Sequence, residues 1–453
     1  MRKIGTMATG ALLVGATMML IVVSGSAGGA PKPKPSPTPT PTSPPPTTPP
    51  PAGGFDAERI WSTTNDDWES VVAADPSSNF VYQLTTRIDG ASACGTCPVS
   101  PIMFRASSDS GVTWGATTHI CVCTGHNSWQ ADPQIAVTNT GVVYAFWMNG
   151  YKPGVQFSKS SNRGATWSTP INIRPDGQGA WDDFPHIGIS PDGRDIYAAI
   201  NSGQEYVSYS HDFGATWTTV QASPAGGNFY WFGEGVAVAP NGNVYVAGAQ
   251  NNSSSSNPGN IFVLRSTNGG ATWSSQIVDS TQSAPPCPSA GCSTGFLAAQ
   301  ADIDVDASGK LALLYAKNTA NGAPKSLFLR TSTDGTTWSA PISVNTLGDS
   351  NFPQIVAGPG SNDFRVAWQD DRNGSTVAYN TYYKRTTDGG SSWSVDVDIS
   401  NVNSGAPYKS AAGYAFPYGD YFGIDVDSTG RNHVLWSESV SYNGPGGAWY
   451  TRG

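Results

Sequence analysis

The sequence predicts an all-β fold, a β-propeller of seven blades, over residues 55–453. Three observations predict it: a short turn pattern that recurs six times, a nearly constant spacing between its copies, and a pair of strand patterns ahead of the copies. Self-similarity at a period of this size marks an array of similar supersecondary units. A six-bladed ring is the alternative count.

The turn pattern reads Ser or Thr, any residue, Asp or Asn, any residue, Gly, any residue, Thr or Ser, then Trp. Its six copies, of which the fifth is shortened, end at Trp114, Trp167, Trp217, Trp273, Trp338 and Trp393. The intervals between these tryptophans are 53, 50, 56, 65 and 55 residues, which suits a four-stranded blade. Asp or Asn accepts hydrogen bonds from the turn's own amides, and Gly adopts a conformation that a Cβ disfavours. We therefore expect a structural turn whose Trp packs on the blade.

Two strand patterns joined by a tight turn precede a typical copy, as in Ala131–Trp147. Each unit is expected to run as inner strand, second strand, third strand, turn pattern and outer strand. After the sixth copy, residues 421–453 provide three strands and then the sequence stops. We expect Phe55–Thr63, which precedes the first inner strand at Trp68, to supply the missing outer strand. Closure by both termini removes the exposed sheet edges.

The first 54 residues differ in composition from the rest of the chain. Arg2 and Lys3 are followed by an apolar run over residues 8–23 and then by small residues, which predicts a secretory signal peptide over residues 1–30. Residues 31–54 hold twelve of the 34 prolines and predict an extended linker. We expect a secreted or cell-surface tethered, extracellular protein with no membrane insertion after signal cleavage.

Charge and cysteine content limit the partners. Residues 55–453 carry 20 Lys and Arg against 33 Asp and Glu, a net charge of −13, which argues against nucleic acid or an anionic membrane as partner. Cysteines of an exported chain predict disulfides, with zinc at the first four as the alternative: Cys94, Cys97, Cys121, Cys123, Cys287 and Cys292. A closed ring needs no partner to cover a sheet edge, so we expect a monomer.

The turn pattern resembles the Asp box of the sialidase superfamily, also called the bacterial neuraminidase repeat, and its copies cover most of residues 68–400. The resemblance implies a propeller that acts on glycans as a glycoside hydrolase or a polysaccharide lyase, although Asp-box propellers also include non-enzymatic receptors. A sialidase is expected to carry an early Arg-Ile-Pro motif, an arginine triad and a Tyr nucleophile. The nearest motif here is Arg87-Ile88-Asp89, which lacks the Pro. Arg87, Arg174 and Arg372 are the candidate anion-binding residues, and no triad can be assembled from them.

Acidic residues recur near the start of the inner strands, at the end of the propeller where we expect the working face. They are Glu69, Asp132, Asp182, Asp183, Glu234, Asp302 and Asp420. Carboxylates crowded around one axis raise one another's pKa, which keeps a general acid protonated near neutrality. Aromatic residues that suit sugar binding accompany them: Trp68, Trp129, Trp181, Trp231, Phe352 and Tyr421.

We select candidate site residues from this end of the propeller. The candidate catalytic residues are Asp183, Glu234, Asp420 and Tyr421. The candidate substrate-binding residues are Glu69, Asp132, Asp182, His186, Trp181, Trp231, Asp371 and Arg372. The alternative is structural, because repeat proteins repeat the residues that cap their loops. Under that alternative, Asp370 to Arg372 form a turn held by an Asp–Arg pair.

The acidic and aromatic patterns require no cofactor, and structural calcium is the ion that the acidic strings suggest. The strings Asp302-Ile303-Asp304-Val305-Asp306 and Asp425-Val426-Asp427 place carboxylates on one strand face. Neither string fits the twelve-residue calcium loop, and Asp306 and Asp427 fall at tight-turn positions where Asp is common anyway. No metal ligand is therefore included among the site residues.

Two functions fit the sequence. The first is a secreted, sialidase-like propeller that acts on extracellular glycans or glycoproteins, as a glycoside hydrolase with carboxylates at its working face. The alternative is a non-catalytic secreted or cell-surface propeller that binds glycans or proteins. An acidic rim repels anionic sugars unless arginines compensate, so a neutral glycan suits it as well as a charged one.

Overall fold

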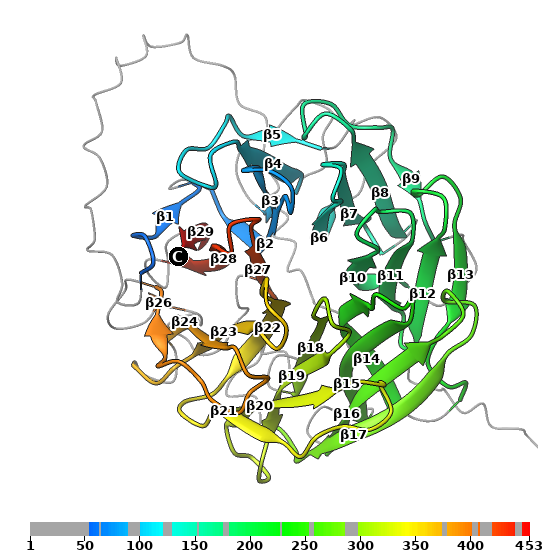
Figure 1. Cartoon of the computed structure of the whole chain (residues 1–453), viewed down its shortest axis with the longest axis vertical. Coiled ribbons are helices and arrows are strands. Elements are labelled where there is room, and N and C mark those ends of the chain that lie inside the picture. The colour runs from blue at the N-terminus through cyan, green and yellow to red at the C-terminus, as the bar shows by residue number, and fades with distance from the viewer. Residues whose placement is uncertain are drawn as a thin grey trace, which may run out of the picture. The chain divides into compact units, whose positions relative to one another are not determined.

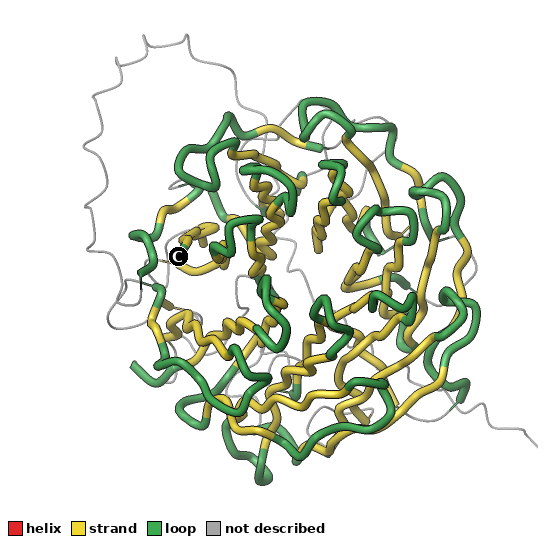
Figure 2. The backbone as a smooth tube through the Cα atoms, viewed as in Figure 1, coloured by secondary structure: helices red, strands yellow, loops and turns green. Residues whose placement is uncertain are grey.

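Seven sheets stand around a central axis in the unit formed by residues 48–453, like the blades of a propeller (Figure 1). The computed structural model describes residues 54–62, 65–88, 100–120, 129–151, 154–174, 181–226, 229–252, 258–285, 298–373, 378–400, 406–407, 419–439 and 446–453. Every element in these ranges is a β-strand, as Figure 2 shows. The predicted signal peptide, nearly all of the predicted linker and the six cysteines lie outside them. In the ranges given above, no helix is long and apolar enough to cross a membrane.

Each blade is an antiparallel sheet, and in blades 1 to 6 the strands follow one another in chain order from the axis outward. Blade 1 consists of β2 (Asp67–Ala74), β3 (Val81–Arg87), β4 (Ile102–Ser107) and β5 (Thr118–His119). Blade 2 consists of β6 (Gln130–Val137), β7 (Val143–Asn149), β8 (Gly154–Ser160) and β9 (Ile171–Asn172). Blade 3 consists of β10 (Asp183–Ile189), β11 (Ile196–Asn201), β12 (Glu205–Ser210) and β13 (Thr218–Gln221).

The next three blades repeat this order. Blade 4 consists of β14 (Phe229–Val238), β15 (Val244–Asn252), β16 (Gly259–Ser266) and β17 (Ser274–Thr281). Blade 5 consists of β18 (Gln300–Val305), β19 (Leu311–Asn318), β20 (Lys325–Ser332) and β21 (Ile342–Asn345). Blade 6 consists of β22 (Asn351–Ala357), β23 (Phe364–Asp370), β24 (Ala378–Thr386) and β25 (Val397–Asp398), with the short β26 (Ala406–Pro407) also pairing β24.

Blade 7 joins the two ends of the propeller. Its strands are β27 (Gly423–Val426), β28 (Asn432–Ser439), β29 (Gly446–Arg452) and β1 (Arg59–Ile60), in that order from the axis. Arg59 lies opposite Tyr450 in the β1–β29 register. The prediction of seven blades closed by an N-terminal strand is confirmed, and the alternative of six is wrong. The closing strand is shorter than Phe55–Thr63, because Phe55 turns into the core instead, where it is 3% exposed.

The recurring turns have the geometry that their sequence predicts. In the first copy, Asp109 accepts hydrogen bonds from the backbone N–H of Thr113 (2.8 Å) and from its hydroxyl (2.6 Å). Ser110 and Gly111 both adopt left-handed backbone conformations, with φ of 54° and 78°. Trp114 then packs edge-on against Tyr450 of blade 7, at 5.0 Å between ring centroids. The turn therefore fastens one blade to its neighbour and is structural.

The second strand of each blade forms the middle of the sheet, between the inner strand and the third. Its side chains are buried on both faces, because neighbouring blades pack on either side. The indole rings of Trp147, Trp368 and Trp436, on β7, β23 and β28, are among the largest fully buried side chains. This packing holds the inner strands rigidly around the axis, where the candidate site lies.

Candidate functional site

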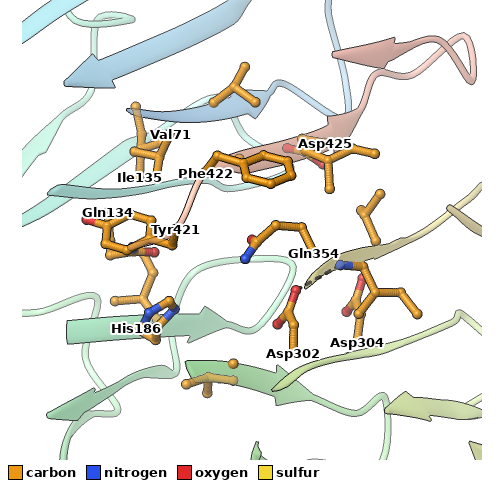
Figure 3. A pocket seen from close by; sticks show the side chains of 18 of the residues that line it. Val71, Gln134, Ile135, His186, Asp302, Asp304, Gln354, Tyr421, Phe422 and Asp425 are labelled. Atoms are coloured by element: carbon orange, nitrogen blue, oxygen red, sulfur yellow. Dashed lines mark hydrogen bonds between the residues drawn. The ribbon is translucent and has the colours of Figure 1, made fainter. Parts of the chain in front are cut away.

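The inner strands of all seven blades enclose a central channel of about 210 Å³. Its polar lining comes from three carboxylates, two glutamines, a histidine and a tyrosine (Figure 3): Asp302, Asp304, Asp425, Gln134, Gln354, His186 and Tyr421. A smaller cavity shares His186, Gln354 and Tyr421 with the channel and is also lined by Glu234 and Asp420. The predicted working end of the propeller is therefore hollow and polar.

Four inner strands begin with a backbone irregularity at the same position. Glu69, Asp132, Phe184 and Phe352 have φ between 51° and 55°, and the pairing of β2, β6, β10 and β22 with their second strands shifts register there. Positive φ is unfavourable for residues with a Cβ, so the surrounding structure must impose it. In blades 1 and 2 this position carries a carboxylate, and in blades 3 and 6 a phenylalanine.

A cluster of four carboxyl groups lies at this end of the axis, and we call Glu69, Asp132, Asp183 and Asp420 the acidic cluster. Glu69 Oε2 accepts the backbone N–H of Asp132 at 2.8 Å. Burial raises the pKa of Glu69, Asp132 and Asp420, and nearby members of the cluster raise that of Asp132 and Asp420 further. Burial, followed by the charge of Glu69, raises the pKa of Asp183 to about 7. The cluster therefore retains protons near neutral pH.

Three members of the acidic cluster have the spacing of a cation site. One oxygen atom each from Glu69, Asp132 and Asp420 lies within 4.8 Å of the others. An all-oxygen donor set of this kind suits a hard divalent cation such as Ca²⁺. These are the residues that could hold a metal in the part of the chain that the structure describes, and they differ from the two Asp strings that suggested calcium in the sequence.

Many carboxylates on or near the inner strands accept a hydrogen bond from a backbone N–H of the next blade. Glu234 Oε2 accepts the N–H of Ala301 at 2.6 Å. The same kind of bond joins Glu69 to Asp132, Asp132 to Phe184, Glu205 to Gly233, Asp302 to Ile355, Asp304 to Ala357 and Asp425 to Ala74. Buried backbone N–H groups need acceptors, and the free edge of an inner strand has none of its own. The structural interpretation of the repeated acids therefore holds for these inter-blade bonds.

The two Asp strings take part in the same network. Asp302 Oδ1 and Asp304 Oδ1 accept the N–H of the residue that follows each of them. Their Oδ2 atoms accept the N–H groups of Ile355 and Ala357 in blade 6. Asp427 Oδ1 accepts the N–H groups of Thr429 and Arg431, as expected of a tight turn. Calcium at these strings stays a prediction that the structure does not test.

The channel carboxylates make the stability of the fold depend on pH. Burial raises the pKa of Asp302 to about 8, that of Asp425 to about 7 and that of Asp304 to about 6, against an ordinary value of 3.8. Between about pH 4 and pH 8 the folded chain thus holds protons that the unfolded chain has lost, so stability falls as pH rises. We expect a higher melting temperature at about pH 5 than at about pH 8, measured by differential scanning calorimetry. The Asp302→Asn variant should show a shallower pH dependence, and a melting temperature that rises toward pH 8 would contradict the prediction.

The rings of Tyr421 and His186 lie side by side in the channel, with 5.4 Å between their centroids (Figure 3). The Tyr421 hydroxyl donates to the carbonyl of Pro133 at 3.0 Å, and its side chain is buried. Burial lowers the pKa of His186 to about 3, so the imidazole is neutral at working pH. Tyr421 thus joins blade 7 to blade 2, and both residues line the channel.

The three candidate anion-binding arginines are held in ion pairs in different parts of the ring. Arg87 pairs with Asp67 at 2.8 Å, across the β2–β3 register. Arg174 Nε lies 2.6 Å from Asp182 Oδ1. The structure does not bring these arginines together into a triad.

Arg372 and Asp371 belong to a loop of blade 6. Arg372 contacts Asp370 at 2.6 Å and Asp396 at 2.5 Å, and its guanidinium lies over the ring of Tyr382. Asp371 Oδ1 accepts the N–H of Asp349 at 2.8 Å. These contacts agree with the alternative of a turn held by an Asp–Arg pair.

A row of half-buried aromatic rings runs beside the acidic cluster across blades 2 to 4, and we call Trp129, Tyr151, Trp181 and Tyr230 the aromatic row. Consecutive ring centroids are 5.0, 6.2 and 5.8 Å apart. All four members of the acidic cluster raise the pKa of Tyr151 through their charges, after burial, and Asp183 does the same for Tyr230. The row and the cluster are therefore electrostatic neighbours within one site.

The sequence missed two members of this row. Trp231, which it selected, is 5% exposed and packs on Phe262 in the core. Strand alternation places Tyr230 on the opposite face of β14, and this residue stacks with Trp181. Tyr151 follows the second strand of blade 2, which ends at the same face where inner strands begin. Alternation and chain direction were the signals that would have identified both tyrosines.

Comparisons with known proteins support the fold. No protein-family model matches the chain, and no curated protein matches it. Among solved structures, an ulvan lyase of a new polysaccharide lyase family is similar at 11% identity and a TM-score of 0.50, over 86% of this chain and 95% of that one. The chain shares its β-propeller fold. YCF48 bound to D1 peptide is also similar (14% identity, TM-score 0.47, 88% and 96% covered).

A Hadza microbial sialidase is similar at 14% identity and a TM-score of 0.44, over 86% of this chain and 66% of that chain. At such identities the likeness concerns the fold alone. The propeller fold that the resemblance to the sialidase superfamily implied is shown by the seven four-stranded blades.

Proposed function

We propose that this protein is an exported glycan-cleaving enzyme, a glycoside hydrolase whose site is the acidic cluster together with the aromatic row. The observation that carries the proposal is their adjacency: the Tyr151 carbonyl accepts the N–H of Asp182 at 3.2 Å, and Asp182 lies between Trp181 of the row and Asp183 of the cluster. The charges of the four cluster carboxylates also raise the pKa of Tyr151. Glycosidases need a protonated carboxyl group beside an ionised one, and sugars bind to flat apolar rings next to hydrogen-bonding groups.

Asp183 and Asp420 are the members best placed for chemistry. Both are partly exposed, whereas Glu69 and Asp132 are buried and hold inter-blade bonds. Asp420 Oδ1 has no hydrogen-bond partner among the described residues. Glu234 and Tyr421, the other two candidates, are buried and bonded to the backbone of blades 5 and 2.

In the proposed reaction, the protonated carboxyl of Asp183 donates its proton to the glycosidic oxygen as the bond to the anomeric carbon breaks. Water supplies the hydroxyl group that the anomeric carbon gains, and its proton passes to an ionised carboxylate of the acidic cluster. A pKa of about 7 keeps a large fraction of Asp183 protonated at neutral pH.

A neutral glycan is the substrate that the charges favour. The cluster is anionic once its protons leave, and Arg87, Arg174 and Arg372 are already paired with carboxylates. An anionic sugar would therefore meet repulsion without a matching cation from these residues.

Mass spectrometry of glycans incubated with the whole protein tests the proposal. The panel should contain neutral, uronic and sialylated oligosaccharides, with and without calcium. We expect products of neutral oligosaccharides that have gained water. Unsaturated products would replace the hydrolase with a lyase, and intact glycans at high protein concentration would overturn the enzyme.

A non-catalytic glycan-binding propeller is the second candidate, and one observation favours it. Glu69, Asp132 and Glu234 each accept a backbone N–H of a neighbouring blade, so some acidic residues at this end of the propeller serve the fold. If the whole cluster served the fold, the aromatic row would still bind sugars. Binding without any product in the same panel would support this second function.

A further inference from the structure

The aromatic row extends one blade beyond the acidic cluster on this side of the ring. Trp129 and Tyr151 belong to blade 2, Trp181 precedes the inner strand of blade 3, and Tyr230 lies at the start of β14 in blade 4. A pocket for a single sugar unit would need rings converging on one point. Here the rings follow one another around the axis instead.

We propose that this row is a platform for a linear neutral oligosaccharide, so that the substrate is a stretch of a polysaccharide chain and not a single terminal sugar. The proposal rests on the proposed function, whose site it extends. Each ring is half-buried and so fixed in place, while part of its surface stays open to solvent. Rings with two rotatable bonds offer contact area at a low cost in conformational entropy, which makes them effective anchors.

Consecutive rings of the row contact one another, which fixes their orientations before a ligand binds. Trp129 and Trp181 both meet Tyr151 edge-on, at interplanar angles of 82° and 79°. Trp181 and Tyr230 are nearly parallel, at 25°. Successive sugars on such a row would meet aromatic surface in each of three blades, and the cluster beside Tyr151 would face one glycosidic bond within the chain.

The tyrosine hydroxyls add neutral polar groups to the platform. Burial, and then the nearby carboxylates, raise the pKa of Tyr151 and Tyr230, so both stay protonated and can donate hydrogen bonds to sugar hydroxyls. Uncharged donors suit uncharged sugars. This agrees with a neutral chain as ligand.

The test is a binding series measured by isothermal titration calorimetry. The probes are β-1,4-linked gluco-, manno- and xylo-oligosaccharides and α-1,5-linked arabino-oligosaccharides, from the monosaccharide to the hexasaccharide. The Asp183→Asn variant of the whole protein is used so that turnover does not interfere. For one of the four series, we expect the affinity to rise with chain length and then level off.

Trp181→Ala, added to that variant, should weaken binding of the longest probe by about tenfold or more, the loss typical of an aromatic anchor. Its effect on the monosaccharide should be small. Phe213→Ala is the matched control, because Phe213 is an exposed aromatic residue in the Asp-box turn at the opposite end of blade 3. It should bind like the parent variant.

The outcomes separate the platform from the enzyme. Equal affinity for short and long probes, equal affinity of the Trp181 and Phe213 variants, or no binding of any probe by folded protein would overturn the platform. If the platform is overturned but the unsubstituted protein hydrolyses simple monosaccharide glycosides, the glycoside hydrolase function still stands. Length-dependent binding with no hydrolysis would overturn the hydrolase and keep the platform.

Discussion

Replacing Asp183 by Asn is expected to lower kcat for glycan hydrolysis by about 10²- to 10⁴-fold, the range that a positioned general acid contributes. Burial and the charge of Glu69 raise the pKa of Asp183 to about 7, which makes its carboxyl group a proton donor near neutrality. An amide of the same shape cannot donate that proton. The measurement is steady-state kinetics of the variant on the neutral oligosaccharide that the protein cleaves.

The pH profile gives a second readout for Asp183. Because the acid acts in its protonated form, kcat/KM of the unsubstituted protein should fall above about pH 7, and the residual activity of Asp183→Asn should lack this fall. Asp195→Asn is the matched control, since Asp195 lies in the turn between β10 and β11 at the other end of the same blade, paired with His211. Full activity in Asp183→Asn would remove this residue from the mechanism.

The fold was predictable because its determinants are local. The turn pattern fixes a hairpin through Asp109 and its equivalents, and the interval between copies fixes the length of a blade. Counting strands after Trp393 then required an N-terminal strand to complete the last blade. The exact extent of that strand was not predictable, because Phe55 is buried against a residue far away in the sequence. The ring centroids of Phe55 and Tyr383 are 4.9 Å apart.

The candidate site was predictable only as a region. The acids recur at equivalent positions in the repeats, so the sequence gives no way to tell a catalytic carboxylate from one that holds the next blade. Glu234 and Asp183 look alike in sequence, yet Glu234 is bonded to the N–H of Ala301 and Asp183 is partly exposed beside the aromatic row. The register shift comes at a different place in each of the two strands, between Asp183 and His186 in β10 and between Gly233 and Gly235 in β14.

The choice of aromatic residues failed for a related reason. β14 starts earlier relative to its blade than the other inner strands and spans ten residues. Trp231 therefore lies inside the strand, where alternation sends it into the core, while Tyr230 points the other way. The arginine pairs also depend on register: Asp67 and Arg87 are direct partners across β2 and β3.

Changes at the N-terminal strand that closes the propeller should lower its stability most, and Phe55→Ala is the smallest such change. Phe55 is 3% exposed, packs on Tyr383 of blade 6, and precedes the strand that completes blade 7. Phe55→Ala should lower the free energy of unfolding by about 3 to 5 kcal/mol, the usual cost of removing a buried aromatic side chain. Urea unfolding followed by tryptophan fluorescence measures it.

Removing residues 1–62 should have a still larger effect than Phe55→Ala. The deletion takes away β1 together with the Asp56 carboxylate, which pairs with Arg452 at 2.6 Å, and leaves β29 as an unpaired outer edge. Exposed edges of this kind promote aggregation, so we expect a loss of monomer in size-exclusion chromatography. Phe213→Ala, at a side chain that is 47% exposed, should change stability by no more than about 0.5 kcal/mol. A stable monomer after the deletion would mean that three strands suffice for blade 7 and that closure by the N-terminus is dispensable.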